Sequence, residues 1–418
     1  MAILAVAAFL AVYTIVINDV PIRSDGYSYY VYLPSWLLYR DATLEALARD
    51  WYGGSYPAFS AIARWPGTGY WLNAHPIGEA ILMAPFFGVG HLLTRWANLP
   101  PDGFSFYYQY TAGLAGLTYF VAGLALLRRV LLRHFAPRIA LATLVAITFG
   151  TNLFHYGVYE STFSHAFSFF LITLFLDLTD RWWTEESFAL ACALGVTAAL
   201  VFLTRHTNAL FLLMLPLWGV SGRFRLDGAA LWNRRGQLTT MVAVAAAGAL
   251  PQLLIYRRAT GSWIVSSYGA VGAGFTFASP HLYGVLFSTQ KGLFFWSPIL
   301  LLAVAGLPVA RGWARRLVAP TVVIFVVNTY LIASWSDWQF GASYGHRGFT
   351  DGLGVLAVYL ATFFSWASER PRLAMGVGVI AGVAVLLSTL QMLQYWFGIL
   401  PIADTTWEQY RSIFLRLS

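Results

Sequence analysis

Long apolar stretches separated by short polar segments run through the sequence from one end to the other. They lack the alternation of a half-buried strand, and they exceed the roughly ten residues of a membrane-barrel strand. About 20 apolar residues in a helix cross a hydrocarbon core that is about 30 Å thick. The pattern predicts an all-α polytopic membrane protein with about 11 transmembrane helices. The expected spans are 2–17, 107–127, 139–154, 163–179, 187–203, 208–221, 237–256, 294–310, 318–334, 352–366 and 373–393.

Composition agrees with a membrane protein and excludes several function classes. Of the 418 residues, 58% are hydrophobic and 11% are charged, whereas a soluble protein carries roughly a quarter charged residues. The net charge of +8 is typical of loop arginines that orient a membrane protein, so we expect no nucleic-acid partner. The single cysteine, Cys192, excludes an internal disulfide and a cysteine zinc site. No phosphate-binding loop motif is present, and we expect no cytosolic nucleotide-binding domain.

The arginines predict the orientation, because cytoplasmic loops are enriched in basic residues. Segment 77–94 is long enough to cross the membrane but carries Glu79 and Pro85. If this segment does not cross, four basic loops share one side with the N-terminus. We therefore expect 77–94 to form a hairpin or a juxtamembrane helix on the outer side. The loops contain Arg128, Arg129, Arg133 and Arg138; Arg223, Arg225, Arg234 and Arg235; Arg311, Arg315 and Arg316; and Arg370 and Arg372.

This orientation predicts one transmembrane domain over 1–418 in a bacterial-type inner (plasma) membrane. The N-terminus is expected in the cytoplasm and the C-terminus outside, without a separate soluble C-terminal domain. Two large extracytoplasmic loops cover 18–106, with juxtamembrane helices, and 257–293. The polar motifs of the chain fall on this outer face, so we expect the active site to be extracytoplasmic.

The segment "SDGYSYYVYLPSWLL" places Asp25 just after the first apolar stretch. A purely structural interpretation is a turn or helix cap, because Ser, Asp and Gly are favoured in turns. A carboxylate shielded by Tyr27 and its neighbouring tyrosines could instead act as a general base. Those tyrosines could equally belong to the aromatic belt at the membrane interface.

Two further motifs supply acids and imidazoles to the outer face. In "LNAHPIGEA", His75 and Glu79 share a helix face if the helix begins near Pro76. They could bind a divalent metal ion, or simply a helix terminus. The motif "HYGVYESTFSHAF" offers Tyr159, Glu160 and His165 as substrate-binding residues, with interfacial exposure as the alternative.

Three separated cations also belong to the predicted outer face. Arg205 in "LTRHTNAL", followed by Asn208, could bind phosphate with its guanidinium fork or reach toward lipid headgroups. Lys291, the only lysine in the chain, could bind a phosphate oxygen or lie at the interface. The segment "SWSDWQFGASYGHRGFTD" adds Arg347 as a third phosphate ligand, with Tyr344 and His346 as substrate contacts.

An outer active site has no nucleotide sugar available, so a sugar donor must arrive on a lipid. We therefore predict transfer of a sugar from a polyprenyl-phosphate donor to a glycan, lipid or protein acceptor hydroxyl. Asp25 would be the base, and Arg205, Lys291 and Arg347 would hold the phosphate. A polysaccharide polymerase or ligase using lipid-pyrophosphate sugars, or a lipid or solute transporter or flippase, remains the alternative.

The N-terminal third resembles the GT-C superfamily of integral-membrane glycosyltransferases. The resemblance rests on "RSDGYSYYVYLPSWLL" and "NAHPIGEAILMAPFFGVG", and is most similar to protein O-mannosyltransferases and aminoarabinose transferases. It implies that Asp25 is the catalytic aspartate of the first loop, acting in an inverting single displacement. The chain departs from the family pattern, because Gly26 follows Asp25 where several relatives have a second acid. Ala74 and His75 precede Pro76, where some relatives have a lysine.

Overall fold

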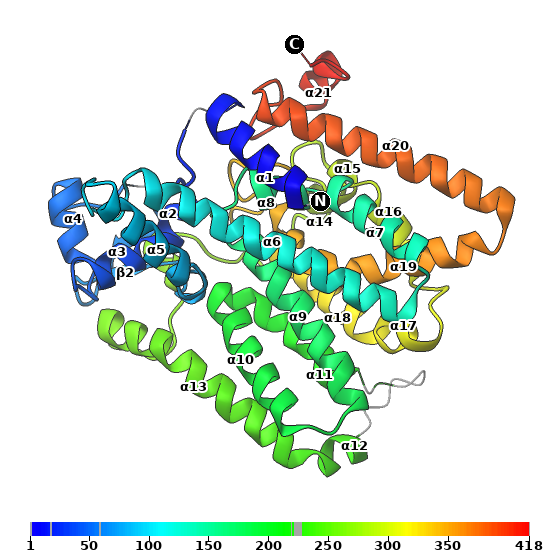
Figure 1. The fold of residues 1–418 in the computed structure, drawn as a ribbon, viewed down its shortest axis with the longest axis horizontal. Coiled ribbons are helices and arrows are strands. Elements are labelled where there is room, and N and C mark those ends of the chain that lie inside the picture. Colours follow the sequence, from blue (N-terminus) through cyan, green and yellow to red (C-terminus); the bar gives the residue numbers. More distant parts are fainter. Residues whose placement is uncertain (1, 17–18, 58–59, 219, 221–227, 418) are drawn as a thin grey trace.

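The structure is a computed structural model that describes residues 2–16, 19–57, 60–218, 220 and 228–417. As predicted, the fold is all-α (Figure 1). Strands β1 (Ile62–Arg64) and β2 (Trp71–Asn73) are the exception within these residues, and they pair as one small antiparallel sheet in the first loop. Arg223 and Arg225, assigned to a basic loop, lie outside the described residues.

The helices of the first half include the predicted first loop and the apolar segments after it. They are α1 (Ala2–Ala11) with a π-helical turn η1 (Val12–Val16), α2 (Asp25–Tyr30), α3 (Tyr32–Leu37), α4 (Glu45–Tyr52), α5 (Gly78–Trp96), α6 (Phe106–His134), α7 (Pro137–Phe149), α8 (Leu153–Val158), α9 (Ser164–Thr184), α10 (Phe188–Thr204), the 3₁₀ helix η3 (His206–Leu213) and α11 (Met214–Leu217).

The second half continues with both long and very short helices. They are α12 (Gly228–Asn233), α13 (Arg235–Thr260), η4 (Ser267–Val271), α14 (Leu282–Phe287), α15 (Leu293–Trp296), α16 (Leu300–Gly306), α17 (Gly312–Arg316), α18 (Val318–Ala333), η5 (Arg347–Gly352), α19 (Leu353–Ser368), α20 (Pro371–Trp396) and α21 (Trp407–Ile413).

The predicted count of about 11 spans is wrong for the described residues. Four helices are long and apolar enough to cross a membrane: Phe106–His134, Arg235–Thr260, Arg347–Ser368 and Pro371–Trp396. Five other apolar helices have only 10–17 residues. At 1.5 Å per residue such helices are shorter than a hydrocarbon core about 30 Å thick.

Several expected spans fail for local reasons. The stretch 294–310 divides into α15 and α16 around Ser297 and Pro298, because proline disfavours helix in the residue before it. The stretch 208–221 begins as the 3₁₀ helix η3. Segment 77–94 is one continuous helix, α5, with Pro85 inside, so the hairpin alternative is wrong.

The helix bundle has a polar region at each end. The direction in which each helix runs decides whether its first or its last residues lie at a given end. At one end lie α2, the start of α9, the end of α10 and η5; we call it the Asp25 end. The opposite end contains the end of α6, the end of α9 and α17, and we call it the Arg133 end. Figure 1 shows α2, α3, α4 and β2 gathered at one side and α12 and α17 away from them. The long helices α6 and α9, which pack together, therefore connect two separate polar regions.

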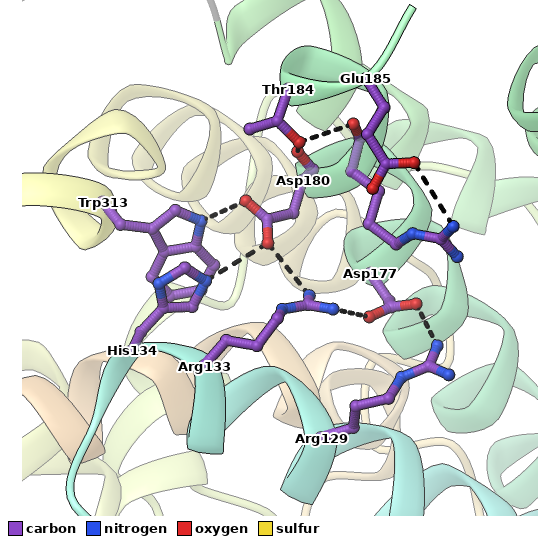
Figure 2. Close-up of polar contacts among 9 residues, drawn as sticks. Arg129, Arg133, His134, Asp177, Asp180, Thr184, Glu185 and Trp313 are labelled. Carbon is purple, nitrogen blue, oxygen red and sulfur yellow. Dashed lines mark hydrogen bonds and ion pairs between the residues drawn. The ribbon is translucent and has the colours of Figure 1, made fainter. Parts of the chain in front are cut away.

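An ion-pair network ties the helices together at the Arg133 end (Figure 2). Asp177 is fully buried and pairs with Arg129 and, at 2.8 Å, with Arg133. Asp180 accepts from Arg133 at 3.0 Å and from the Trp313 indole at 2.6 Å. The basic residues that the sequence assigned only to orientation thus also join α6, α9 and α17.

Candidate functional site

Asp25 is the first residue of α2, directly after the positive-φ residue Ser24. The next residue, Gly26, lies so close to the Thr162 side chain that any Cβ there would collide with it. The glycine therefore lets α2 pack directly against the turn between α8 and α9. This contact explains why a glycine, rather than a second acid, follows Asp25 in this chain.

The Asp25 carboxylate forms an ion pair of 2.9 Å with the guanidinium of Arg347, the first residue of η5. The side chains are 26% and 13% exposed, so water screens the pair only in part. The Phe163 and Phe340 rings lie 5.5 and 5.8 Å from the Arg347 guanidinium. Burial raises the pKa of Asp25, but Arg347, followed by His75 and His165, holds it below its usual value. Asp25 is therefore an ionised carboxylate at neutral pH.

A second network surrounds Asp351, one helical turn beyond Arg347. Its carboxylate lies 2.7 Å from His165 Nδ1 and 3.7 Å from the Arg205 guanidinium. It also accepts a hydrogen bond of 2.9 Å from the Asn208 amide. Three of the predicted site residues, from α9, the α10 end and η3, thus converge on one buried acid.

The two networks belong to the same polar region. Both His165 and Arg205, which contact Asp351, contribute to the lowered pKa of Asp25. Arg205 and Arg347 therefore bring two guanidinium groups to the surroundings of one ionised carboxylate. Such a combination of acid and cations suits an anionic ligand that carries a reacting group.

Glu79 and His75 lie buried beside this region. Glu79 is 0% exposed, and neither of its carboxyl oxygens has a hydrogen-bond partner in the described residues. Burial, followed by the negative charges of Asp25 and Asp351, raises the pKa of Glu79 well above its usual value. The His75 ring contacts the rings of Tyr29 at 4.4 Å and Tyr268 at 5.7 Å, and burial lowers its pKa to about 4. Burial therefore favours the uncharged form of both groups.

A metal site at His75 and Glu79 would need further ligands. Among the described residues, no group of three or more His, Cys, Asp and Glu side chains is placed to hold a metal ion. The pair alone is a poor cation site, because a protonated carboxyl group is a weak ligand.

Tyr159 and Glu160 belong to a neighbouring cluster around Arg23. The Arg23 guanidinium lies 3.2 Å from the Glu160 carboxylate and 4.9 Å from the centre of the Tyr159 ring. The Tyr159 ring also stacks on Trp396. Burial raises the pKa of Glu160 to about 7 despite the Arg23 charge. These contacts keep the two predicted substrate residues in an ion-pair and aromatic cluster of their own.

Lys291 is near the site but occupied elsewhere. Its ammonium donates to the backbone carbonyls of Ser343 and, at 3.1 Å, of Ile402. The residue is 2% exposed; burial, followed by the charge of Arg347, lowers its pKa to about 7. The structure thus gives Lys291 two backbone partners, and no contact with Asp25 or Arg205.

The other predicted contacts occupy aromatic surroundings. Tyr344 donates to the Ser388 carbonyl at 2.7 Å and is almost fully buried. His346 lies between the rings of Phe340 and Phe349, and burial lowers its pKa to about 3. Tyr27 stacks on Phe104 of the first loop.

Sequence reasoning gave no role to Asp351, Arg23 or Tyr268, and it used Tyr29 only as one of the tyrosines that shield Asp25. Asp351 lies four positions after Arg347 in "RGFTD", a spacing that places both on one helical face. That spacing could have identified Asp351. Tyr268 belongs to the loop 257–293, and its contact with His75 of the first loop has no local signal in the sequence.

The chain matches no protein-family model, and no curated protein matches its sequence.

Proposed function

We propose that this protein is a membrane glycosyltransferase that moves a sugar from a polyprenyl-phosphate donor to an acceptor hydroxyl. One observation carries the proposal: the ionised Asp25 carboxylate pairs at 2.9 Å with Arg347, beside a second guanidinium from Arg205. A base for the acceptor and cations for a phosphate leaving group are what this reaction requires. They come from distant parts of the chain, so local turn chemistry does not account for their meeting.

The reaction would be an inverting single displacement. Asp25 takes the proton of the acceptor hydroxyl while the acceptor oxygen forms a bond to the anomeric carbon. The bond from that carbon to the phosphate oxygen breaks, and the lipid phosphate leaves with the electron pair. Arg347 and Arg205 stabilise the charge that develops on it. A donor phosphate competes with Asp25 for the Arg347 guanidinium, and this competition raises the basicity of the carboxylate when the donor binds.

Glu79 and Asp25 would have different roles because their surroundings push their pKa values apart. Two nearby carboxyl groups, one ionised and one neutral, are a recurring arrangement in acid–base enzymes. A protonated Glu79 donates a hydrogen bond, so it could hold a sugar hydroxyl or ring oxygen. His75, with a buried Nδ1 that has no partner in the described residues, is a second polar contact of this kind.

The Asp25 end would face the outside of a bacterial-type inner membrane. Arginines of the opposite end that form no ion pair within the described residues, such as Arg315 and Arg372, support this orientation because cytoplasmic segments are enriched in basic residues. At an outer face the donor must be carried by lipid. The acceptor would be a glycan, a lipid or a protein.

Purified protein in nanodiscs tests the proposal with a panel of polyprenyl-phosphate sugars and acceptor hydroxyl compounds. We expect sugar transfer or slow release by the wild type and by Asp50→Asn, an exposed acid of α4, but not by Asp25→Asn. A panel of lipid-pyrophosphate sugars runs in parallel. Turnover of these donors alone would identify the polymerase or ligase class instead. Equal turnover by Asp25→Asn would remove Asp25 as the base.

A further inference from the structure

A cavity of about 460 Å³ opens at the Arg133 end of the bundle, away from the site described above. Its wall is formed by the end of α6, by the first residues of α17 and those just before it, and by the end of α19. The lining includes Arg133, His134, Arg311, Trp313, Ser365 and Trp366. The volume lies within the range of small-molecule sites in proteins. Nothing in the proposed glycosyl transfer uses this cavity.

We infer that this cavity binds a phosphate group, as carried by the headgroup of an anionic phospholipid. A soluble phosphate compound has the same chemistry and is the other source to be tested. The inference does not depend on the reaction at the Asp25 end.

The wall of the cavity is held in place by the network in Figure 2. Asp180 lies 3.3 Å from His134 Nε2 and accepts from both Arg133 and the Trp313 indole. The His134 and Trp313 rings stack at 3.8 Å and are nearly parallel. A wall fixed by three partners of one carboxylate needs little reordering when a ligand binds.

The charges on the wall leave a net positive group at Arg311. Among the charged lining residues, Arg133 pairs with Asp177 and Asp180, and Glu369 lies 3.9 Å from Arg370, which does not line the cavity. Arg311 forms no ion pair within the described part of the chain. The carbonyl ends of α6 and α19 add partial negative charge here, so Arg311 is the cation that a phosphate would contact. A free guanidinium fork matches the oxygens of a phosphate.

The position of the cavity favours a lipid as the carrier. Arg133 and His134 end the candidate span Phe106–His134, and Trp366 lies in the last turn of the candidate span Arg347–Ser368. The cavity thus lies where two such helices would leave the hydrocarbon core. Indole rings favour this depth, and anionic headgroups attract clustered arginines there. Trp366 is itself covered by the Arg370 guanidinium at 4.6 Å.

The test compares wild type, Arg311→Glu and Arg235→Glu in nanodiscs that contain equal amounts of phosphatidylglycerol and phosphatidylcholine. Arg235 is the matched control, because it starts α13 and does not line the cavity. Native mass spectrometry counts the lipids retained by each protein. We expect the wild type and Arg235→Glu to retain phosphatidylglycerol preferentially, and Arg311→Glu to retain roughly tenfold less.

A second arm titrates inorganic phosphate into the same proteins in phosphatidylcholine nanodiscs by calorimetry. Binding that is lost in Arg311→Glu, without retention of phosphatidylglycerol, would assign the cavity to a soluble phosphate compound. Equal retention and equal binding by all three proteins would overturn the inference. If Arg311→Glu melts more than a few degrees below the wild type, Arg311→Gln replaces it in both arms.

Discussion

Asp25 and Arg347, from opposite ends of the chain, form a 2.9 Å ion pair at the edge of the bundle. Their pairing links the first loop to the start of the candidate span Arg347–Ser368. The neighbouring network of Asp351, Arg205 and His165 brings further ionisable groups to the same place. Such clusters of ionisable groups are typical of functional sites, and a purely structural ion pair does not require them.

Asp25→Asn should reduce transfer by roughly 10²- to 10⁴-fold, because the amide cannot take a proton from the acceptor. Donor binding should remain, since Arg347 and Arg205 stay in place and an asparagine side chain is nearly the same size. The measurement is turnover together with binding of a labelled donor. Loss of donor binding with normal chemistry on bound donor would contradict the base role.

Arg347→Gln should raise KM for the lipid-phosphate donor by about tenfold or more, because a charge-assisted contact to phosphate is lost. The same change removes the main positive charge that lowers the pKa of Asp25. The acidic limb of the pH profile of kcat/KM should therefore move to higher pH. Arg370→Gln at the opposite end is the control, and it should leave both quantities unchanged. An unshifted acidic limb would separate Arg347 from the titration of Asp25.

Glu79→Gln tests whether the buried carboxyl group is neutral in the folded protein. A raised pKa means that the folded state binds more protons than the unfolded state above pH 4.5. This stabilisation is complete below that pH and is lost as the pH rises through the folded-state pKa. Because glutamine cannot ionise, the melting temperature of Glu79→Gln relative to wild type should rise between pH 5 and pH 8.

The same Glu79 variant also separates two roles in catalysis. An amide can replace a protonated acid as a hydrogen-bond donor, so activity should fall by less than about tenfold. Abolished activity with an unchanged melting curve would instead indicate that the ionised form of Glu79 is required.

The sequence predicted the helical class better than it predicted the number of spans. Apolar length alone marked α6, α13, η5–α19 and α20 correctly as crossing candidates. Apolar length could not predict that Ser297 and Pro298 divide one predicted span, or that another predicted span begins as the 3₁₀ helix η3. Local backbone preferences decide both features, and an average over an apolar run does not contain them.

The partners of each site residue were beyond sequence reasoning for a different reason. The positions of Arg205 and Arg347 were singled out by charge, but the acids opposite them come from distant segments. Lys291 has the right charge for phosphate, yet packing aims its ammonium at the carbonyls of Ser343 and Ile402. The residue types of a motif show which ligands it could bind, whereas tertiary contacts decide which side chains are free to bind them.

Asp351→Ala should destabilise the protein more than any exposed acidic substitution. The side chain is only 2% exposed, and its removal leaves the buried His165 and the partly exposed Arg205 without their acid. Breaking a buried ion pair by removing one partner costs about 3–5 kcal/mol. The expected result is a clear loss of melting temperature in detergent, whereas Asp50→Ala on α4 should change little. Asp351→Asn keeps an oxygen that can accept from Asn208 and should fall between the two. Equal melting curves for Asp351→Ala and wild type would show that Asp351 does not hold α9, the α10 end and η3 together.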